Sequence, residues 1–166
     1  ITPAARGAES PLSFGQERIW FIQKTNPESI AYSYGVKFCF EGELSVPTLE
    51  RCLTEELRRH EIYRTSFHDS LSEPVQRVHP PWSVKLPLID LTAWPEETRQ
   101  AEAERQLDTQ LREPFDLGRA PLVRWTLLRL DPHTHWLLHL ENHLVHDGWA
   151  SDLFFQELLD LYNAFR

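Results

Sequence analysis

Apolar and polar residues alternate along several short segments of the chain, and a two-residue period is typical of β-strands with one covered face. Valine and phenylalanine alternate with polar residues over 34–40, so this segment is predicted to be a strand that ends at the Glu41-Gly42 turn. Residues 64–68 predict another strand. Short strands are also expected over 75–78 and 84–86, within a proline-rich stretch.

Other segments repeat apolar residues at every third or fourth position, which is the pattern of helices with one buried face. A short first helix is predicted over 17–24, because Ser13 and Gln16 form an S-x-x-Q capping box ahead of it. Three further helices are expected: from Ser45 and Pro47 to about His60, from Pro95 to about Glu113, and from Ser151 or Asp152 onward.

Two segments near the C-terminal end, 122–130 and 135–143, are apolar on both faces and are separated by four residues, which predicts a β-hairpin. Strands without a polar face belong in the centre of a sheet that is covered on both sides. Helices mixed with a partly antiparallel sheet predict an α/β (α+β) fold, arranged as a two-layer sandwich with a mixed sheet flanked by helices. We expect residues 1–10 to form an extended lead-in.

The composition narrows the possible partners. The chain has 166 residues, which fits one domain or one lobe of a larger domain. Its formal charge is -8, and no basic run exceeds Arg58-Arg59, so nucleic acid and membrane partners are disfavoured. Cys39 and Cys52 lie in apolar-periodic segments and are expected to be reduced, buried packing residues. Without a membrane span or signal peptide in the sequence, the expected location is cytoplasmic.

Histidines are concentrated in the second hairpin strand and the residues after it. His135, His139 and His143 are spaced four apart and would share one face of a helix, as zinc-binding helices require. The segment has a strand pattern, however, in which four residues span about 13 Å, too far for three ligands of one ion. Only His143, His146 and Asp147 are close enough, so the sequence predicts no metal site here.

His143 is the candidate for chemistry because it leaves a buried strand just before a tight Asp147-Gly148 turn into a helix. An imidazole on a rigid element beside a helix N-terminus suits a general base. The partial positive charge of the helix N-terminus favours the neutral imidazole, which can accept a proton. The alternative is a hydrogen-bonded core histidine, with Asp147 serving only as a helix cap. The spacing alone leaves both interpretations open.

Three stretches, in this order, resemble motifs of the condensation domains of nonribosomal peptide synthetases, which belong to the chloramphenicol acetyltransferase-like superfamily. Residues 13–20, SFGQERIW, resemble Ser-x-Ala-Gln-x-Arg-Leu-Trp. Residues 59–67, RHEIYRTSF, resemble Arg-His-Glu-x-Leu-Arg-Thr-x-Phe. Residues 141–150, ENHLVHDGWA, resemble the His-His-x-x-x-Asp-Gly signature, and residues 115–117 with 121–122 fit the family's stretch before the hairpin. The resemblance implies the N-terminal lobe of a chloramphenicol acetyltransferase-like fold.

The resemblance also implies a reaction. Condensation domains form an amide bond between an acyl thioester donor and an amino acid acceptor, each tethered through phosphopantetheine to a carrier protein. His143 matches the second, catalytic histidine of the signature and would deprotonate or orient the acceptor amine, without an acyl-enzyme. The implied partners are carrier-protein domains and the C-terminal lobe of the same domain, and the lobe itself would bind no cofactor.

Other residues of the signature are assigned roles by the same resemblance. Asp147 matches its structural aspartate, and Arg64 is the expected partner of that carboxylate, which we expect to be buried. Gly148 matches its glycine, where the missing side chain leaves room for a close approach. Asn142 replaces the first histidine. On an extended strand Asn142 points away from the face that holds His143, so we expect it to pack and form hydrogen bonds.

Several functional subtypes share these motifs. The run from His146 to Trp149 resembles initiating domains, which N-acylate a first residue. The alternatives are an epimerization domain, a noncatalytic condensation-like recruitment module, and a free-standing acyltransferase that uses coenzyme A. The sequence lacks methionine and ends within a helical pattern, so we expect both ends to have been cut from a longer chain. Without a second lobe, the chain is expected to fold but not to catalyse.

Overall fold

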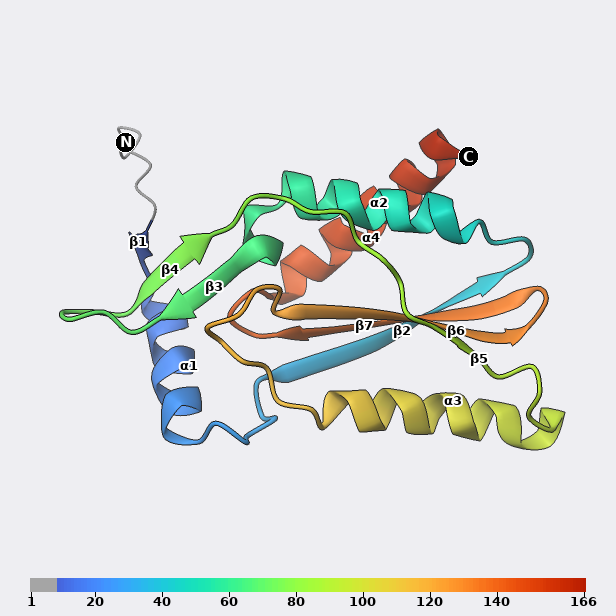
Figure 1. Cartoon of the computed structure of the whole chain (residues 1–166), viewed down its shortest axis with the longest axis horizontal. Coiled ribbons are helices and arrows are strands. Elements are labelled where there is room, and N and C mark those ends of the chain that lie inside the picture. The colour runs from blue at the N-terminus through green and yellow to red at the C-terminus, as the bar shows by residue number, and fades with distance from the viewer. Residues whose placement is uncertain (1–8) are drawn as a thin grey trace.

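The computed structural model of the chain describes residues 9–166 (Figure 1). Its strands form two sheets, and helices pack against the larger one. In chain order they are β1 (Ser10–Pro11), α1 (Phe14–Thr25), β2 (Ser33–Glu41), α2 (Val46–Arg59), a 3-10 helix η1 (Glu61–Arg64), β3 (Thr65–His68), β4 (Val75–Val78), β5 (Leu88–Asp90), α3 (Glu96–Leu111), β6 (Val123–Asp131), β7 (Thr134–Asn142) and α4 (Gly148–Phe165).

The main sheet has four strands in the order β2-β7-β6-β5. β6 and β7 form the predicted hairpin, β2 pairs antiparallel with β7, and β5 pairs parallel with β6, so the sheet is mixed, as predicted. The two strands that are apolar on both faces lie in its centre, which confirms their predicted position.

Helices cover both faces of this sheet (Figure 1). On one face, Leu127 of β6 and Leu137 of β7 belong to a core that includes Leu53 of α2 and Phe154 of α4. On the other face, alternate residues of the same strands form a second core with α1 and α3. The α/β architecture is therefore confirmed, and the sheet is the middle of three layers, one more than expected from the sequence. The expected lead-in at 1–10 lies mainly outside the described residues, since only its last residue, in β1, is placed in an element.

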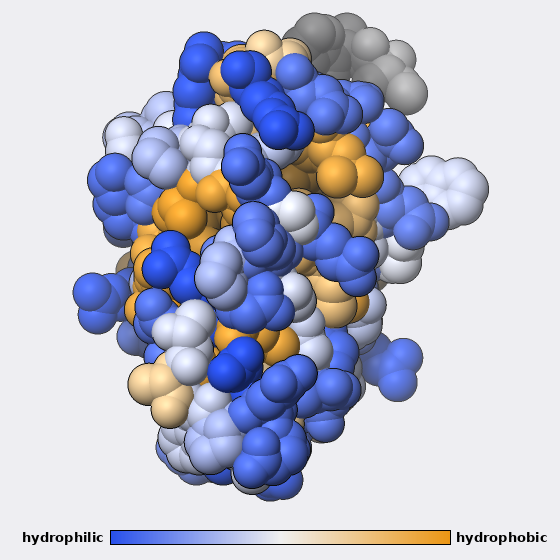
Figure 2. Space-filling view, turned by 90° about the vertical axis from the view of Figure 1, so that its right-hand side faces the viewer, coloured by the Kyte–Doolittle hydropathy of each residue, from blue (hydrophilic) through white to orange (hydrophobic). Residues whose placement is uncertain are grey.

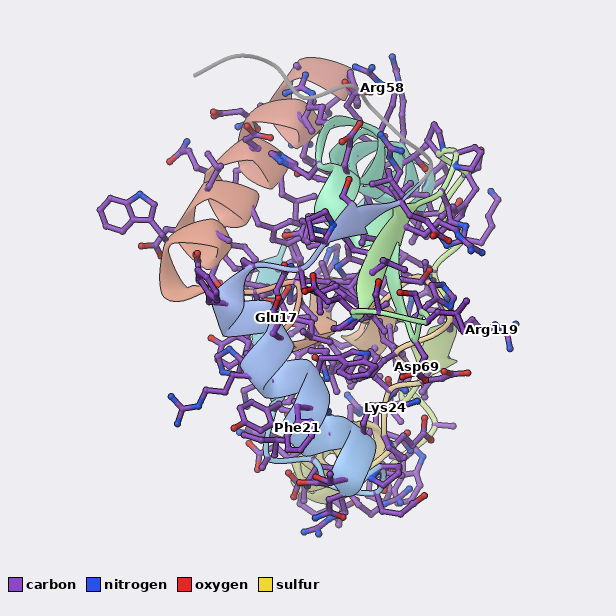
Figure 3. All side chains as sticks on the ribbon, turned by 90° about the vertical axis from the view of Figure 1, so that its left-hand side faces the viewer. Glu17, Phe21, Lys24, Arg58, Asp69 and Arg119 are labelled. Atoms are coloured by element: carbon purple, nitrogen blue, oxygen red, sulfur yellow. The ribbon has the colours of Figure 1, made fainter. Side chains whose placement is uncertain are left out.

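A second sheet, with the strand order β1-β4-β3, lies beside α1. Lys24 Nζ on α1 approaches Asp69 Oδ2, just after β3, at 2.5 Å, and this ion pair ties the helix to the small sheet (Figure 3). Ser13 caps α1 as predicted, because its Oγ accepts from Gln16 N at 3.3 Å and its N–H donates to Gln16 Oε1 at 3.0 Å. No helix within residues 9–166 is long and apolar enough to cross a membrane.

The strand predicted over 84–86 is wrong, because this segment follows α2 instead of joining a sheet. Val84 N donates to Thr54 Oγ1 at 2.9 Å, and Leu86 N donates to Glu50 Oε1 at 3.0 Å, so side chains of α2 take the backbone donors that a strand would use. The edge strand of the main sheet is β5, which begins immediately after Pro87.

The two cysteines differ in burial. Cys52 lies on the sheet-facing side of α2, is fully buried, and its burial raises the pKa of the thiol to about 11. Cys39 is exposed, so its predicted burial is wrong. It lies on β2, an edge strand of the main sheet, and an edge strand is covered less completely than the apolar pattern of the chain suggests.

Candidate active site

His143 lies in the turn that follows β7, before α4 begins. Its backbone N–H donates to the carbonyl of Tyr32 at 2.8 Å, which anchors the turn to the segment before β2. The imidazole itself is exposed, and its ring is nearly perpendicular to the Tyr32 ring at a centroid distance of 6.3 Å. An exposed imidazole on an anchored backbone is available to a substrate, so the interpretation of His143 as a core histidine does not fit.

The side chain of Asn142 points into the protein and holds the turn through buried hydrogen bonds. It is fully buried, its Nδ2 donates to Gln23 Oε1 of α1 at 3.0 Å, and its Oδ1 accepts from Leu144 N at 3.0 Å. Buried amides need such partners, since an unpaired one costs about 1–3 kcal/mol. The residue that replaces the first signature histidine therefore packs and forms hydrogen bonds next to His143.

The start of α1 also holds this turn, through a side chain. Gln16, a member of the capping box, also donates from Nε2 to the carbonyl of Leu144 at 3.1 Å. The turn is thus held by α1, by the segment before β2 and by Asn142. Sequence reasoning identified Gln16 as a cap only. Its role at the site depends on a contact between residues 128 positions apart, which no local pattern reveals.

A buried chain of polar side chains lies behind the turn, on the α4 side of the main sheet. Trp125 Nε1 donates to His139 Nδ1 at 2.8 Å, so the proton of this imidazole resides on Nε2 when the ring is neutral. His139 Nε2 then donates to Glu141 Oε2 at 3.2 Å, and both side chains are only 2% exposed. The other carboxylate oxygen of Glu141, Oε1, contacts His146 Nδ1 directly.

His146 connects this buried chain to the exposed histidine. Its ring stacks on Tyr34 at a centroid distance of 4.6 Å, and Ser151 Oγ lies 3.2 Å from its Nδ1. The centroids of the His146 and His143 rings are 5.3 Å apart, and the ring planes make an angle of 65°. The sequence-based prediction missed Glu141 and the role of His146. The available signal was a carboxylate within an otherwise apolar central strand, two residues after a histidine.

Asp147 caps α4. Its Oδ1 accepts from Ala150 N at 2.8 Å, so the helix begins at Gly148, three residues before the earlier of its predicted start points. The Asp147 side chain is exposed, contrary to the expected burial. At Gly148, a Cβ would meet no atom within 4 Å, so within residues 9–166 the space above this glycine is open.

The expected ion pair between Arg64 and Asp147 is not formed. Arg64 Nη1 donates to the carbonyl of His79 at 2.6 Å, and Nη2 lies 3.3 Å from Glu61 Oε1. The guanidinium therefore binds η1 and the residue that follows β4. Because Asp147 is exposed and already accepts a backbone hydrogen bond, it does not require a buried cationic partner.

An open cavity of about 490 Å³ lies in front of the turn. Its walls come from the start of α1, the turn after β7 and the first residues of α4, and they include Gln16, His143, His146 and Asp147. Figure 3 shows α1 and α4 at this end of the molecule. The opposite end, which carries the hairpin tip, presents mainly hydrophilic residues with small apolar patches between them (Figure 2).

Within residues 9–166, one group of histidine and carboxylate side chains places its donor atoms within 4.8 Å of one another, as a metal ion would require. It consists of Glu56, His60 and Glu157, from α2 and α4. The histidine-rich segment does not contribute to this group, and the sequence-based prediction did not include it.

The sequence and the structure both match known proteins. A family model described as a condensation domain matches residues 7–166. The chain therefore belongs to the condensation domain family, which confirms the predicted resemblance. Chondramide synthase cmdD of Chondromyces crocatus is 40% identical over 155 residues, which cover 93% of this chain and 4% of that protein. Tyrocidine synthase 3 of Brevibacillus parabrevis is 34% identical over 164 residues, which cover 99% of this chain and 2% of that protein.

Solved structures agree with the family assignment. The starter condensation domain of the rhizomide synthetase RzmA superposes with a TM-score of 0.87 at 26% identity, over 95% of this chain and 38% of that chain. The first condensation domain of the CDA synthetase gives a TM-score of 0.87 at 25% identity, over 97% of this chain and 41% of that chain. The chain thus spans about two fifths of the solved domains and a few per cent of the two synthetases.

Proposed function

We propose that the chain is the first lobe of a condensation domain that joins an acyl thioester to an acceptor amine, with both substrates carried on phosphopantetheine arms of carrier proteins. The observation that carries this proposal is the exposed imidazole of His143. It lies at the end of a central strand, on the wall of an open cavity, with its backbone fixed by a hydrogen bond to Tyr32. The related synthetases support the substrate class.

The chemistry requires one proton acceptor near the nucleophile. The amine nitrogen attacks the thioester carbonyl, a C–N bond forms, the C–S bond breaks, and the thiol group of the phosphopantetheine arm leaves. His143 would accept the proton that the amine loses, or orient the amine for attack, and the leaving thiolate would take up that proton. Direct attack needs no nucleophilic side chain. In agreement, Cys52 is buried with a raised pKa, which makes it a poor nucleophile.

The surroundings of His143 fix the backbone that carries its imidazole. Gln16 and Asn142 hold the turn, and His146 with Glu141 lies behind it. A fixed base reduces the entropic cost of reaching the attack geometry. The chain spans 38% of the rhizomide domain, so we propose that a second lobe supplies the opposing wall and that the isolated chain forms no product.

The proposal extends to the subtype. The rhizomide neighbour is described as a starter domain, and one of its variants was solved with C8-CoA. We propose that the donor here is likewise an acyl group, in an initiating domain. The test compares an octanoyl carrier with an aminoacyl carrier as donor. Faster amide formation from the aminoacyl carrier would contradict the initiating subtype and leave the role of His143 intact.

The catalytic proposal is tested by His143→Ala in the complete condensation domain, with carrier-bound product measured by intact-protein mass spectrometry. Loss of a general base reduces rates by about 10²–10⁴-fold, so amide formation should fall by at least about 100-fold. His133→Ala, at the exposed hairpin tip, is the matched control and should leave turnover unchanged. Unchanged turnover in His143→Ala would remove this residue from the mechanism and favour a noncatalytic recruitment module.

A further inference from the structure

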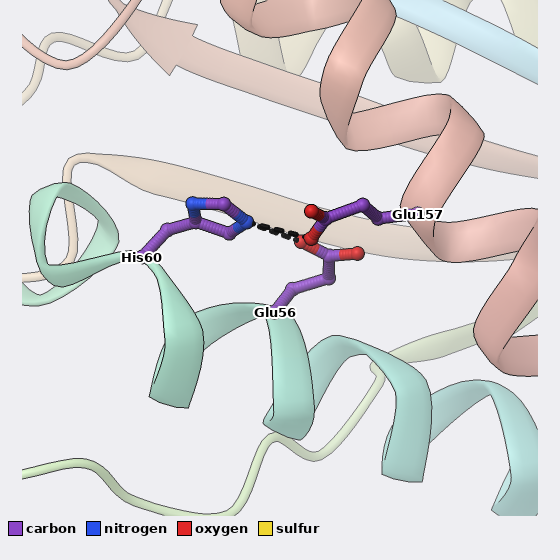
Figure 4. A group of neighbouring side chains, drawn as sticks. All are labelled: Glu56, His60 and Glu157. Carbon is purple, nitrogen blue, oxygen red and sulfur yellow. Dashed lines mark hydrogen bonds and ion pairs between the residues drawn. The ribbon is translucent and has the colours of Figure 1, made fainter.

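Glu56, His60 and Glu157 meet where the C-terminal end of α2 packs against α4 (Figure 4). Glu56 and His60 are four residues apart and therefore share one face of the helix end. His60 Nε2 lies 2.8 Å from Glu157 Oε2 and 3.4 Å from Glu56 Oε2. Two carboxylates and one imidazole thus converge on one point between the helices.

This group has too few donors for its acceptors. Glu56 is fully buried, and neither of its carboxylate oxygens has a hydrogen-bond partner in the described chain. His60 offers one Nε2 proton, and that atom lies closer to Glu157. Arg59 is the neighbouring cation, but its Nε is bound to Glu55 at 2.8 Å, and its Nη1 remains 3.9 Å from Glu157.

The surroundings also penalise a second negative charge. Burial, and then the charge of Glu157, raise the pKa of Glu56 to about 8. A buried carboxylate without a cation or a hydrogen-bond donor is costly, so its retention between two helices requires a partner.

We propose that Glu56, His60 and Glu157 bind a divalent transition-metal ion of the Zn²⁺ class, which fastens α2 to α4. Two carboxylates and a neutral imidazole carry a charge of -2, which such an ion balances. Ligands at about 2.0–2.1 Å from a tetrahedral ion lie about 3.3 Å apart, and the two distances from His60 Nε2 bracket that value. The side chains of His60 and Glu157 are 27% and 26% exposed, which leaves a path for entry and a position for water.

The site is independent of the proposed catalytic role of His143, because none of its three ligands lines the cavity in front of that residue. Its role would be structural. α2 and α4 pack together on the same face of the main sheet, and α4 begins at the turn that carries the catalytic candidate. A metal ion between these helices would fix their relative position.

The test uses the 166-residue chain, stripped of metal with a chelator and titrated with Zn²⁺ by isothermal calorimetry. We expect one ion to bind per chain, because the three side chains form a single group. At a hundredfold excess over Kd, Tm should rise by about 5–10 °C. Absence of 1:1 binding would overturn the proposal.

Variants locate the ion. Glu56→Leu should abolish 1:1 binding while raising the Tm of the metal-free chain, because it replaces a buried carboxylate with an apolar side chain. Glu157→Gln should also abolish 1:1 binding. His133→Asn removes an exposed histidine at the hairpin tip and should leave the isotherm unchanged. If Zn²⁺ binds equally well to Glu56→Leu, the ion lies elsewhere and the proposed site is wrong. A proton, or a positively charged His60, would then balance Glu56.

Discussion

Two buried glutamates occupy opposite situations in this lobe. In β7, one carboxylate oxygen of Glu141 contacts the ring of His139, and the other contacts the ring of His146. Glu56, in α2, is equally buried but faces a second carboxylate and shares a single imidazole with it. The burial of a carboxylate therefore says little by itself. What matters is whether the donors around it match its acceptors.

The difference follows from the elements that carry the neighbours. In β7, residues 139 and 141 point to the same face of the sheet, so the strand itself places the His139 donor next to Glu141. The second histidine, His146, comes from the turn after the strand. In α2, the i,i+4 spacing delivers His60, but α4 contributes the acidic Glu157. In the first arrangement each carboxylate oxygen has a histidine partner, and the group lies next to the turn that carries His143. The second leaves a position for a proton or a cation.

The largest expected effect comes from breaking the matched arrangement. Glu141→Leu should destabilise the chain by about 2–4 kcal/mol, because it removes the acceptor of two largely buried imidazoles. Glu141→Gln retains a carbonyl acceptor for His139 and should cost less than half as much. Both values are measured by urea denaturation at pH 7. Equal losses in the two variants would show that the negative charge, not hydrogen-bond matching, stabilises this group.

Sequence patterns predicted the elements well where periodicity is local. The capping box of Ser13 and Gln16 and the doubly apolar hairpin both fold as expected. The segment over 84–86 failed because its backbone donors are taken by side chains of α2, which belong to a different part of the chain. Periodicity carries no information about such competition for hydrogen bonds.

The candidate site was predicted only in part for the same reason. His143 was recognisable from its place at a strand end and from a family motif. The contact from Gln16 to Leu144, the network of Glu141, and the engagement of Arg64 with Glu61 and His79 depend on segments that meet only in three dimensions.

A smaller effect should appear in the pH dependence of the unmatched group. The pKa of Glu56 in the folded chain is about 8, above its ordinary value of 4.5, so its contribution to stability is fully present below pH 4.5 and is lost as the pH rises through 8. Glu56→Leu should therefore be more stable than the metal-free parent chain by about 1–3 kcal/mol at pH 8.5. The advantage should shrink toward pH 5.

Chemical denaturation with a chelator present, at pH 5, 7 and 8.5, measures this dependence. Saturating Zn²⁺ should remove much of the disadvantage of the parent chain at pH 8.5, since the ion needs the deprotonated carboxylate. A difference between the two chains that does not vary with pH would mean that Glu56 is not protonated in the folded state.

The smallest expected effect concerns Glu55, the residue next to Glu56 in sequence, whose pKa is shifted in the opposite direction. Arg58 and Arg59 donate to Glu55 and lower its pKa to about 2, so its contribution is present above pH 4.5 and is lost as the pH falls toward 2. These pairs lie at the surface, where an i,i+4 pair contributes about 0.3–0.5 kcal/mol. Glu55→Gln should cost that amount at pH 7 in low salt.

Raising the salt concentration to about 1 M shortens the screening length to about 3 Å and should abolish the cost of Glu55→Gln, whereas the cost of Glu141→Leu should remain. The comparison is made by urea denaturation of both variants at low and high salt. A salt-resistant loss at Glu55 would indicate that this side chain stabilises α2 by a contribution other than its ion pairs with Arg58 and Arg59.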